Sequence, residues 1–288
     1  MKRKKMLMFA IPALLLGLIA MIHAGNRIID TRNTNREGSS AYEELSAQVR
    51  KHTSTDIKLP DAGIGDIRTE MAADISVTHD DGAQVSQAVK TRIYIPDIEI
   101  DFEALREINN DSAAWLYNPG TVIDYPVFET DNYTYYISHL PDGTANANGS
   151  LFIDYNNTSD FSGPLTVIYG HHMKSGKMFG SLVGYKQQEF YDLHPYMYLY
   201  TEHENYRIDL MYGAVIGAGK WKEHAFMFTE NKENLLAYAM DNTTFESDVE
   251  YKEGDRVVVL STCSYEFNEA RYIVVGILRP EWGEGVRS

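Results

Sequence analysis

The sequence predicts a mostly β fold, an antiparallel sandwich or a barrel, and three observations support this prediction. Short runs rich in β-branched and aromatic residues recur from residue 91 onward, turn residues separate them, and few helical patterns intervene. Apolar residues make up 44% of the 288 residues, which is enough for a sizeable core. We therefore expect the main folded domain to span residues 91–288.

Two helices are expected within this domain. A short helix is expected in "FEALREI", after Asp101, which can cap it. A helical insertion is expected in "NKENLLAYAMDN", before the strand that ends in Cys263, the single cysteine of the chain. The strand-like runs are "RIYIPDIEI", "TVIDYPVF", "SLFIDY", "PLTVIYG", "YMYLYT", "YRIDLMYGAVIGA", "RVVVLST" and "RYIVVGIL".

The N-terminus predicts export. Residues 1–5 form a basic tail, and residues 6–24 contain an uncharged apolar run from Met6 to Ile22, at the lower limit of about 17 to 25 residues for a spanning helix. The positive-inside rule keeps the tail in the cytoplasm and sends the rest of the chain out. We expect a single-pass anchor in the cell membrane, with the folded domain outside the cell. A cleavable signal peptide ending near Ala24 is the alternative.

Residues 25–90 are polar and read as an extracellular linker with one helix. This helix is expected over Ser40–Lys51, because Ser40 and Glu43 form a capping box. Its apolar face consists of Tyr42, Leu45 and Val49. The face is narrow, so the helix either packs on a neighbouring domain or belongs to a stalk.

Charge and cysteine content exclude some functions. The formal net charge is −15, and so acidic a chain repels phosphate backbones, so no nucleic-acid partner is expected. The single cysteine cannot form an internal disulfide.

That cysteine, Cys263, lies at the end of a predicted strand, and Arg271 opens the next. A loop short enough for a hairpin joins the two strands, which would place them side by side, about 4.8 Å apart. A guanidinium there favours the thiolate and can hold a carbonyl oxygen that gains charge. The alternative is a buried, inert cysteine.

His171 and His172 emerge where the strand "PLTVIYG" ends. A histidine in such a position can exchange protons with a thiol. The alternatives are solvated rings or adventitious metal binding. No C-x-x-C or H-E-x-x-H pattern accompanies the pair, so we expect neither a metal site nor a cofactor.

The pattern Leu-Ser-Thr-Cys, a short loop and then Arg271, with Tyr-Gly-His far upstream, resembles the sortases. Within them the chain is similar to class B over about Ile98 to Leu278. The matching blocks are "IDFEALREINNDSAAWLYNPGTVIDYPVF", "NGSLFIDYNN", "YGHHMKSGKMFG" and "VVVLSTCSYEFNEARYIVVGIL".

The resemblance implies a closed sortase-type β-barrel with N-terminal helices and a helix before the Cys263 strand. It implies a membrane-anchored cysteine transpeptidase of Gram-positive bacteria. Cys263 would attack the threonine carbonyl of a C-terminal sorting signal in a secreted protein. An amine of a peptidoglycan precursor, or of a pilin, would resolve the thioacyl-enzyme. His171, rather than His172, would be the general acid and base, and Arg271 would stabilise the oxyanion.

Several points stay open at this stage. Ser261 and Thr262 either contact the substrate or serve strand packing and hydrogen bonding. The same residues would make a cysteine peptidase if water resolved the thioacyl, and a non-enzymatic surface protein could carry an incidental thiol. The sequence does not distinguish an Asn-Pro-x-Thr signal from a Leu-Pro-x-Thr-Gly signal, or wall anchoring from pilus assembly.

Overall fold

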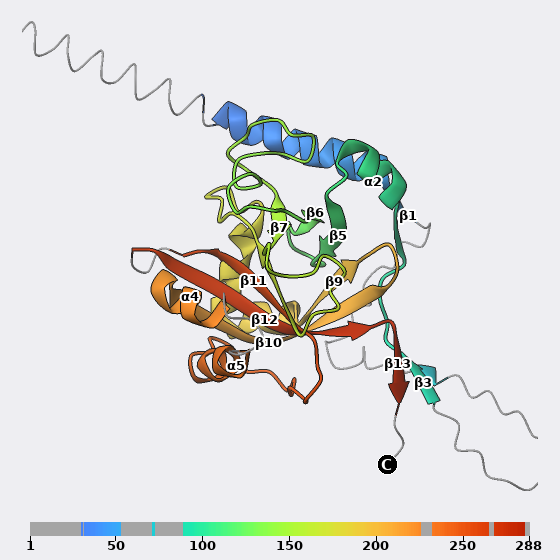
Figure 1. Ribbon diagram of the computed structural model, residues 1–288, viewed down its shortest axis with the longest axis vertical. Coiled ribbons are helices and arrows are strands. Elements are labelled where there is room, and N and C mark those ends of the chain that lie inside the picture. Colours follow the sequence, from blue (N-terminus) through green and yellow to red (C-terminus); the bar gives the residue numbers. More distant parts are fainter. Residues whose placement is uncertain are drawn as a thin grey trace, which may run out of the picture.

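The computed structural model describes residues 30, 32–52, 71–72, 89–225, 232–264 and 268–285. Its centre is a closed eight-stranded barrel (Figure 1), with the strand order β10-β12-β11-β8-β7-β6-β5-β9. The strands are β5 (Ser112–Tyr117), β6 (Asp124–Phe128), β7 (Leu151–Ile153), β8 (Leu165–Tyr169), β9 (Tyr196–Tyr200), β10 (Asn205–Gly217), β11 (Val257–Cys263) and β12 (Ala270–Pro280). The predicted mostly β fold with a closed barrel is confirmed.

The barrel departs from the sequence prediction in two respects. It is not wholly antiparallel, because β8 runs parallel to β11 and β6 runs parallel to β7. Strand β5 was not expected, since "SAAWLY" lacks the alternation of polar and apolar residues that marks a half-buried strand. It nevertheless closes the barrel between β6 and β9.

Strand β11 shows why the wall of the barrel is so apolar. Val258 and Leu260 belong to one hydrophobic cluster, whereas Val257 and Val259 belong to a second. The second cluster includes side chains of α4 (Ala218–Ala225) and α5 (Lys232–Asp241), which lie outside the barrel. A strand covered on both faces must be apolar at successive positions, as "VVVL" is. Helix α5 is the predicted insertion before the Cys263 strand, and α4 was not expected.

The N-terminal helix spans residues 32–49 and lies along the barrel (Figure 1). Its predicted face is confirmed, because Tyr42, Leu45 and Val49 are buried in the same cluster as the barrel interior. The predicted start at Ser40 is wrong, because Ser40 lies in the middle of the helix. Gly38 extends the buried face by one turn, so the polar stretch before Ser40 is helical as well.

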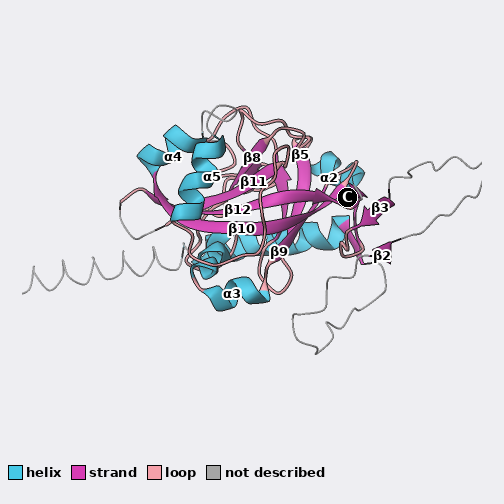
Figure 2. Cartoon of the chain, turned by 90° about the horizontal axis from the view of Figure 1, so that it is seen from below, coloured by secondary structure: helices cyan, strands magenta, loops and turns pink. Residues whose placement is uncertain are grey.

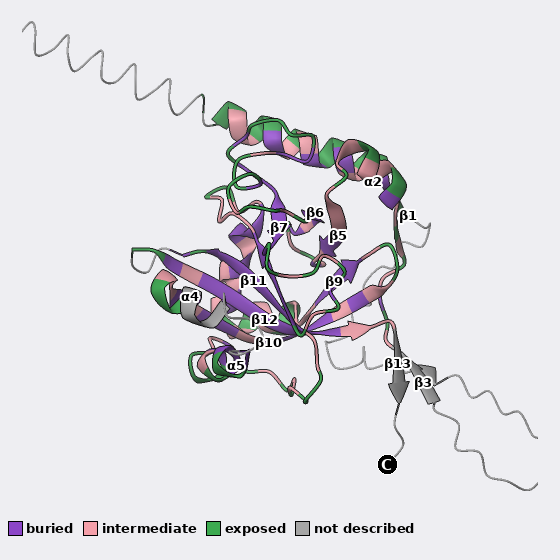
Figure 3. Ribbon diagram, viewed as in Figure 1, coloured by how far each residue is buried: buried purple, intermediate pink, exposed green. Residues whose placement is uncertain are grey.

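The remaining elements surround the barrel, with the helices on its outside (Figure 2). Helix α2 (Phe102–Ile108) is confirmed, and the Asp101 side chain accepts from the Ala104 N–H at its start. The others are β1 (Arg50–His52) paired with β4 (Ile98–Ile100), the small sheet of β2 (Met71–Ala72), β3 (Val89–Arg92) and β13 (Trp282–Gly285), the 3₁₀ helix η1 (Phe179–Lys186) and α3 (Gln188–Leu193). Figure 3 shows buried residues along the barrel strands and exposed residues on the outer side of the N-terminal helix.

No helix within the described ranges is long and apolar enough to cross a membrane. The predicted anchor at residues 6–24 lies outside these ranges.

Candidate active site

Strands β11 and β12 form the expected pair. They are antiparallel neighbours, and Cys263 is the direct partner of Arg271 across them. Cys263 is the last residue of β11 and the only exposed one, since the six residues before it are buried. The sulfur therefore emerges at the end of the barrel, and the alternative of a buried thiol does not apply.

The strand before the two histidines completes the same end of the barrel. Strand β8 runs parallel to β11, with Tyr169 level with Ser261. The Gly170 N–H donates to the Ser261 carbonyl at 3.2 Å, so the backbones stay together beyond the end of β8. His171 therefore follows β8 at the level where Cys263 ends β11. Three adjacent strands, β8, β11 and β12, thus bring His171, Cys263 and Arg271 to one end of the barrel.

The two histidine rings are held in different ways. His171 Nε2 lies 2.6 Å from the Ile137 carbonyl oxygen, and His172 Nδ1 lies 2.9 Å from the Cys263 carbonyl oxygen. A carbonyl oxygen only accepts, so each of these nitrogens carries its proton. His171 is left with Nδ1 for exchange of a proton. Within the described part of the chain, the Cys263 sulfur makes no hydrogen bond to either ring. Such contacts commonly tighten only when substrate is bound.

Arg271 is held over an aromatic ring rather than by a carboxylate. Its guanidinium carbon lies 6.0 Å from the Tyr169 ring centroid, and among the described residues it forms no salt bridge. The Tyr169 hydroxyl donates to Asp154 at 2.9 Å. Burial and the Asp154 charge raise the pKa of Tyr169, while Arg271 opposes them. The Arg271 charge is therefore available to an anionic group at the rim.

Ser261 and Thr262 lie inside the wall of the barrel. Each is only 1% exposed. Thr262 Oγ1 donates to the Gly170 carbonyl at 2.8 Å, and Ser261 Oγ has no hydrogen-bond partner in the described structure. The Thr262 bond fits the strand hydrogen-bonding alternative, and contact of either side chain with a substrate stays a prediction.

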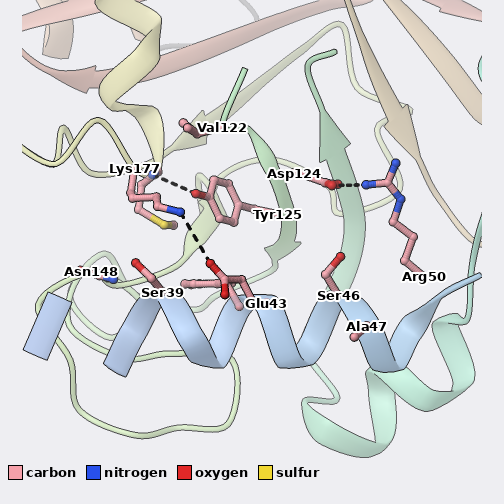
Figure 4. A pocket seen from close by; sticks show the side chains of 12 residues that line it. Ser39, Glu43, Ser46, Ala47, Arg50, Val122, Asp124, Tyr125, Asn148 and Lys177 are labelled. Atoms are coloured by element: carbon pink, nitrogen blue, oxygen red, sulfur yellow. Dashed lines mark hydrogen bonds and ion pairs between the residues drawn. The ribbon is translucent and has the colours of Figure 1, made fainter. Parts of the chain in front are cut away.

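A cavity of about 560 Å³ lies between the N-terminal helix and the barrel (Figure 4). One wall is the N-terminal helix, and another includes Lys177 and Met178. These two residues end the loop of residues 171–178, which we call the histidine loop. Lys177 of this loop lies 4.0 Å from Glu43 of the helix, and the Met178 N–H donates to the Tyr125 hydroxyl at 3.3 Å. The helix and the histidine loop are therefore in contact, and no local pattern in the sequence predicted this contact.

Two groups near the site lacked a sequence signal. Ile137 lies in an irregular loop outside the matching blocks, and Asp154 lies in the block "NGSLFIDYNN" but was assigned no role from the sequence. Within the residues that the structure describes, no three His, Cys, Asp or Glu side chains lie close enough together to hold a metal ion.

A closed barrel that brings an exposed cysteine, a histidine and an arginine to one end has the groups of a cysteine acyl-transfer enzyme of the sortase type. No family model matches the chain. The chain is 30% identical over 187 residues to sortase B of Listeria monocytogenes, which covers 63% of this chain and 75% of that protein. The chain belongs to the sortase family, class B, and is a cysteine transpeptidase. Its membership excludes the non-enzymatic alternative.

Solved structures agree with this assignment. Sortase B of Clostridium perfringens is 27% identical, with a TM-score of 0.58 over 62% of this chain and 99% of that chain. A class B sortase of Streptococcus pyogenes involved in pilus biogenesis is 28% identical, with a TM-score of 0.56 over 62% of this chain and 97% of that chain.

Proposed function

We propose that the chain cleaves a C-terminal sorting signal of secreted proteins after threonine and transfers the protein to an amine. The observation that carries the proposal is the register of β8, β11 and β12, which brings His171, Cys263 and Arg271 to one end of the barrel. The nucleophile is exposed there, as attack on a peptide requires.

The proposed reaction has two acyl transfers. The Cys263 thiol gives its proton to His171, and the resulting thiolate attacks the threonine carbonyl carbon. Arg271 stabilises the negative charge that develops on the oxygen. His171 donates a proton to the leaving amine as the peptide C–N bond breaks, which leaves a thioester. The acceptor amine then attacks the thioester and gives a proton to His171, an amide forms, and the thiolate is released. No cofactor takes part.

A peptide-library cleavage assay tests this proposal. Peptides of the Asn-Pro-x-Thr and Leu-Pro-x-Thr-Gly types are incubated with the chain, with and without an amine. We expect cleavage after threonine that Cys263→Ala abolishes and His171→Ala reduces by roughly 100-fold or more. Cleavage that survives in Cys263→Ala would show that the nucleophile is assigned wrongly.

The same assay separates the transpeptidase from a peptidase reaction. If an amine increases turnover and appears in the product, the thioester is resolved by transfer. If the amine changes neither the turnover nor the product, water hydrolyses the thioester. Peptidoglycan-derived amines and a pilin lysine peptide, used in parallel, distinguish wall anchoring from the pilus role of the Streptococcus pyogenes relative.

We further propose that residues 6–24 tether the enzyme to the outside of the cell membrane, with the N-terminus in the cytoplasm. The uncharged run after a basic tail supports this location. We expect the chain in the membrane fraction, sensitive to protease added to intact protoplasts. A mature protein that begins near residue 25 in N-terminal sequencing would instead support the cleavable signal peptide.

A further inference from the structure

The His171 ring is oriented by a backbone carbonyl. Its Nε2 lies 2.6 Å from the Ile137 oxygen, a short distance for a nitrogen donor. In cysteine and serine enzymes a third group that binds the far nitrogen of the catalytic imidazole fixes its tautomer and its direction. Here the Ile137 carbonyl occupies that position and keeps the proton on Nε2.

Gly149 lies directly against this carbonyl. Its φ of +58° is in the left-handed region, and a Cβ at this position would lie 2.6 Å from the oxygens of both Ile137 and Tyr136. No side chain can be added there unless the Ile137 carbonyl moves. Gly149 is therefore packed against the acceptor of His171, with no room for a side chain between them.

The N-terminal helix holds Gly149 in turn. The Tyr42 hydroxyl donates to the Gly149 carbonyl at 2.6 Å and lies 2.9 Å from Ser150 Oγ. Ser150 Oγ donates to the His139 carbonyl at 2.9 Å, which closes the loop that begins at Ile137. Tyr42 is only 6% exposed, so this contact is made inside the packed interface between the helix and the barrel.

A second contact fastens the same loop to the helix. Asn146 Nδ2 donates to the Thr34 carbonyl at 3.0 Å, two turns before Tyr42. The Asn146 N–H donates to the Ser138 carbonyl at 2.9 Å, next to Ile137. The loop of residues 137–150 is therefore attached to the helix at two separated points.

We propose that Tyr42, through Gly149 and the Ile137 carbonyl, is a positioning residue for the His171 imidazole. The N-terminal helix is then a working part of the active site, although none of its side chains touches the reacting atoms. The proposal rests on the proposed function insofar as His171 transfers the proton. Nδ1 is the nitrogen that performs this transfer, because Nε2 is engaged by Ile137.

Tyr42→Phe tests the proposal, with Tyr200→Phe as the matched control. Tyr200 is also a buried tyrosine whose hydroxyl donates to a backbone carbonyl, that of Pro96 at 2.9 Å, but it has no contact with the loop of residues 137–150. Both variants lose one bond to a backbone carbonyl, and Tyr42→Phe also loses the contact with Ser150 Oγ. We expect Tyr42→Phe to lower kcat by roughly 10-fold with KM nearly unchanged, because small displacements of a catalytic group are costly. Tyr200→Phe should keep kcat.

A second readout does not depend on activity. Nitrogen-15 NMR of the full chain in detergent reports the tautomer of each histidine, and His171→Asn identifies the His171 signal among the nine histidines. We expect the Nε2–H tautomer for His171 in the unmodified chain and in Tyr200→Phe, and a mixture of tautomers in Tyr42→Phe. We do not expect substitutions at other positions of the N-terminal helix to restore the His171 tautomer or kcat of Tyr42→Phe.

Two results would overturn the proposal: an Nδ1–H tautomer of His171 in the unmodified chain, or equal kcat values for Tyr42→Phe and Tyr200→Phe. Failure of the proposed function gives a different pattern. In that case His171→Asn would leave peptide cleavage intact, while the tautomer of His171 would still depend on Tyr42.

Discussion

Ser261 and Thr262 are neighbours on β11 with the same burial but different hydrogen bonding. Thr262→Val removes the donor to the Gly170 carbonyl, and we expect a loss of about 1 kcal/mol in the free energy of unfolding. Ser261→Ala removes a hydroxyl that has no partner in the described structure, so its effect should stay below about 0.5 kcal/mol. Urea unfolding measures both. A rise in KM for the sorting peptide, at unchanged stability, would instead show that these side chains contact substrate.

His194 predicts a loss of stability in mild acid. Burial lowers the pKa of this histidine, and its ring packs 4.6 Å from that of Phe190. In the unfolded chain His194 takes up a proton near pH 6.5, whereas in the folded chain it takes up this proton only at a lower pH. The free energy of unfolding therefore falls as the pH decreases through 6.5. His194→Gln should show a smaller fall between pH 7.5 and 5.5. His203→Gln, at an exposed turn, is the control and should show the unaltered fall.

At the scale of elements, an ion pair ties the end of the N-terminal helix to the barrel. Arg50, at the start of β1, pairs with Asp124 of β6, and their side chains are 10% and 29% exposed (Figure 4). Asp124 also accepts from Trp115 Nε1 at 2.7 Å. Asp124→Asn leaves the Arg50 charge with no carboxylate in a largely buried place, so we expect a loss of about 3 kcal/mol in the free energy of unfolding.

The double variant Arg50→Met with Asp124→Asn separates charge from packing. It removes both charges, and most of the lost stability should return. Urea unfolding of the two single variants and the double variant gives the coupling between the side chains. A loss below about 1 kcal/mol in Asp124→Asn alone would mean that solvent screens this pair as it does an ordinary surface pair.

The sequence predicted those elements whose physical signal is local. The run "VVVL" marked β11, and the spacing of Tyr42, Leu45 and Val49 marked the buried face of the N-terminal helix. Strand β5 was not predicted, because its apolar surroundings form only when the barrel closes and the local sequence does not record them. The early start of the N-terminal helix was not predicted either. Gly38 packs against Asn148, more than 100 residues away in the chain, and no local pattern records that contact.

The candidate site divides in the same way. Cys263 and Arg271 were predictable as neighbours, because a short hairpin connects them. The choice of His171, rather than His172, as the histidine that acts with Cys263 came from the resemblance to the sortases. The Ile137 carbonyl that binds His171 is a backbone group in an irregular loop, and every residue has such a group, so no pattern of side chains can indicate it.

At the scale of the whole molecule, the N-terminal helix decides where the folded catalytic unit begins. The sequence analysis placed the boundary at residue 91 and assigned residues 25–90 to an extracellular linker with one helix. In the structure the helix buries Tyr42, Leu45 and Val49, with Val49 fully buried, against the interior of the barrel. Burial of three such side chains stabilises the fold by roughly 5 kcal/mol, a large part of the total for an ordinary domain.

Two truncations locate that boundary. Removal of residues 1–31 keeps residues 32–49 of the helix, with Tyr42, Leu45 and Val49. We expect the melting temperature and the peptide cleavage of this variant to match those of the full chain. Removal of residues 1–52 deletes the helix and β1, which pairs with β4. It should lower the free energy of unfolding by roughly 5 kcal/mol and expose apolar surface that binds a hydrophobic dye. If the shorter chain instead unfolds at the same urea concentration as the longer one, the helix is a dispensable part of the linker and the boundary at residue 91 stands.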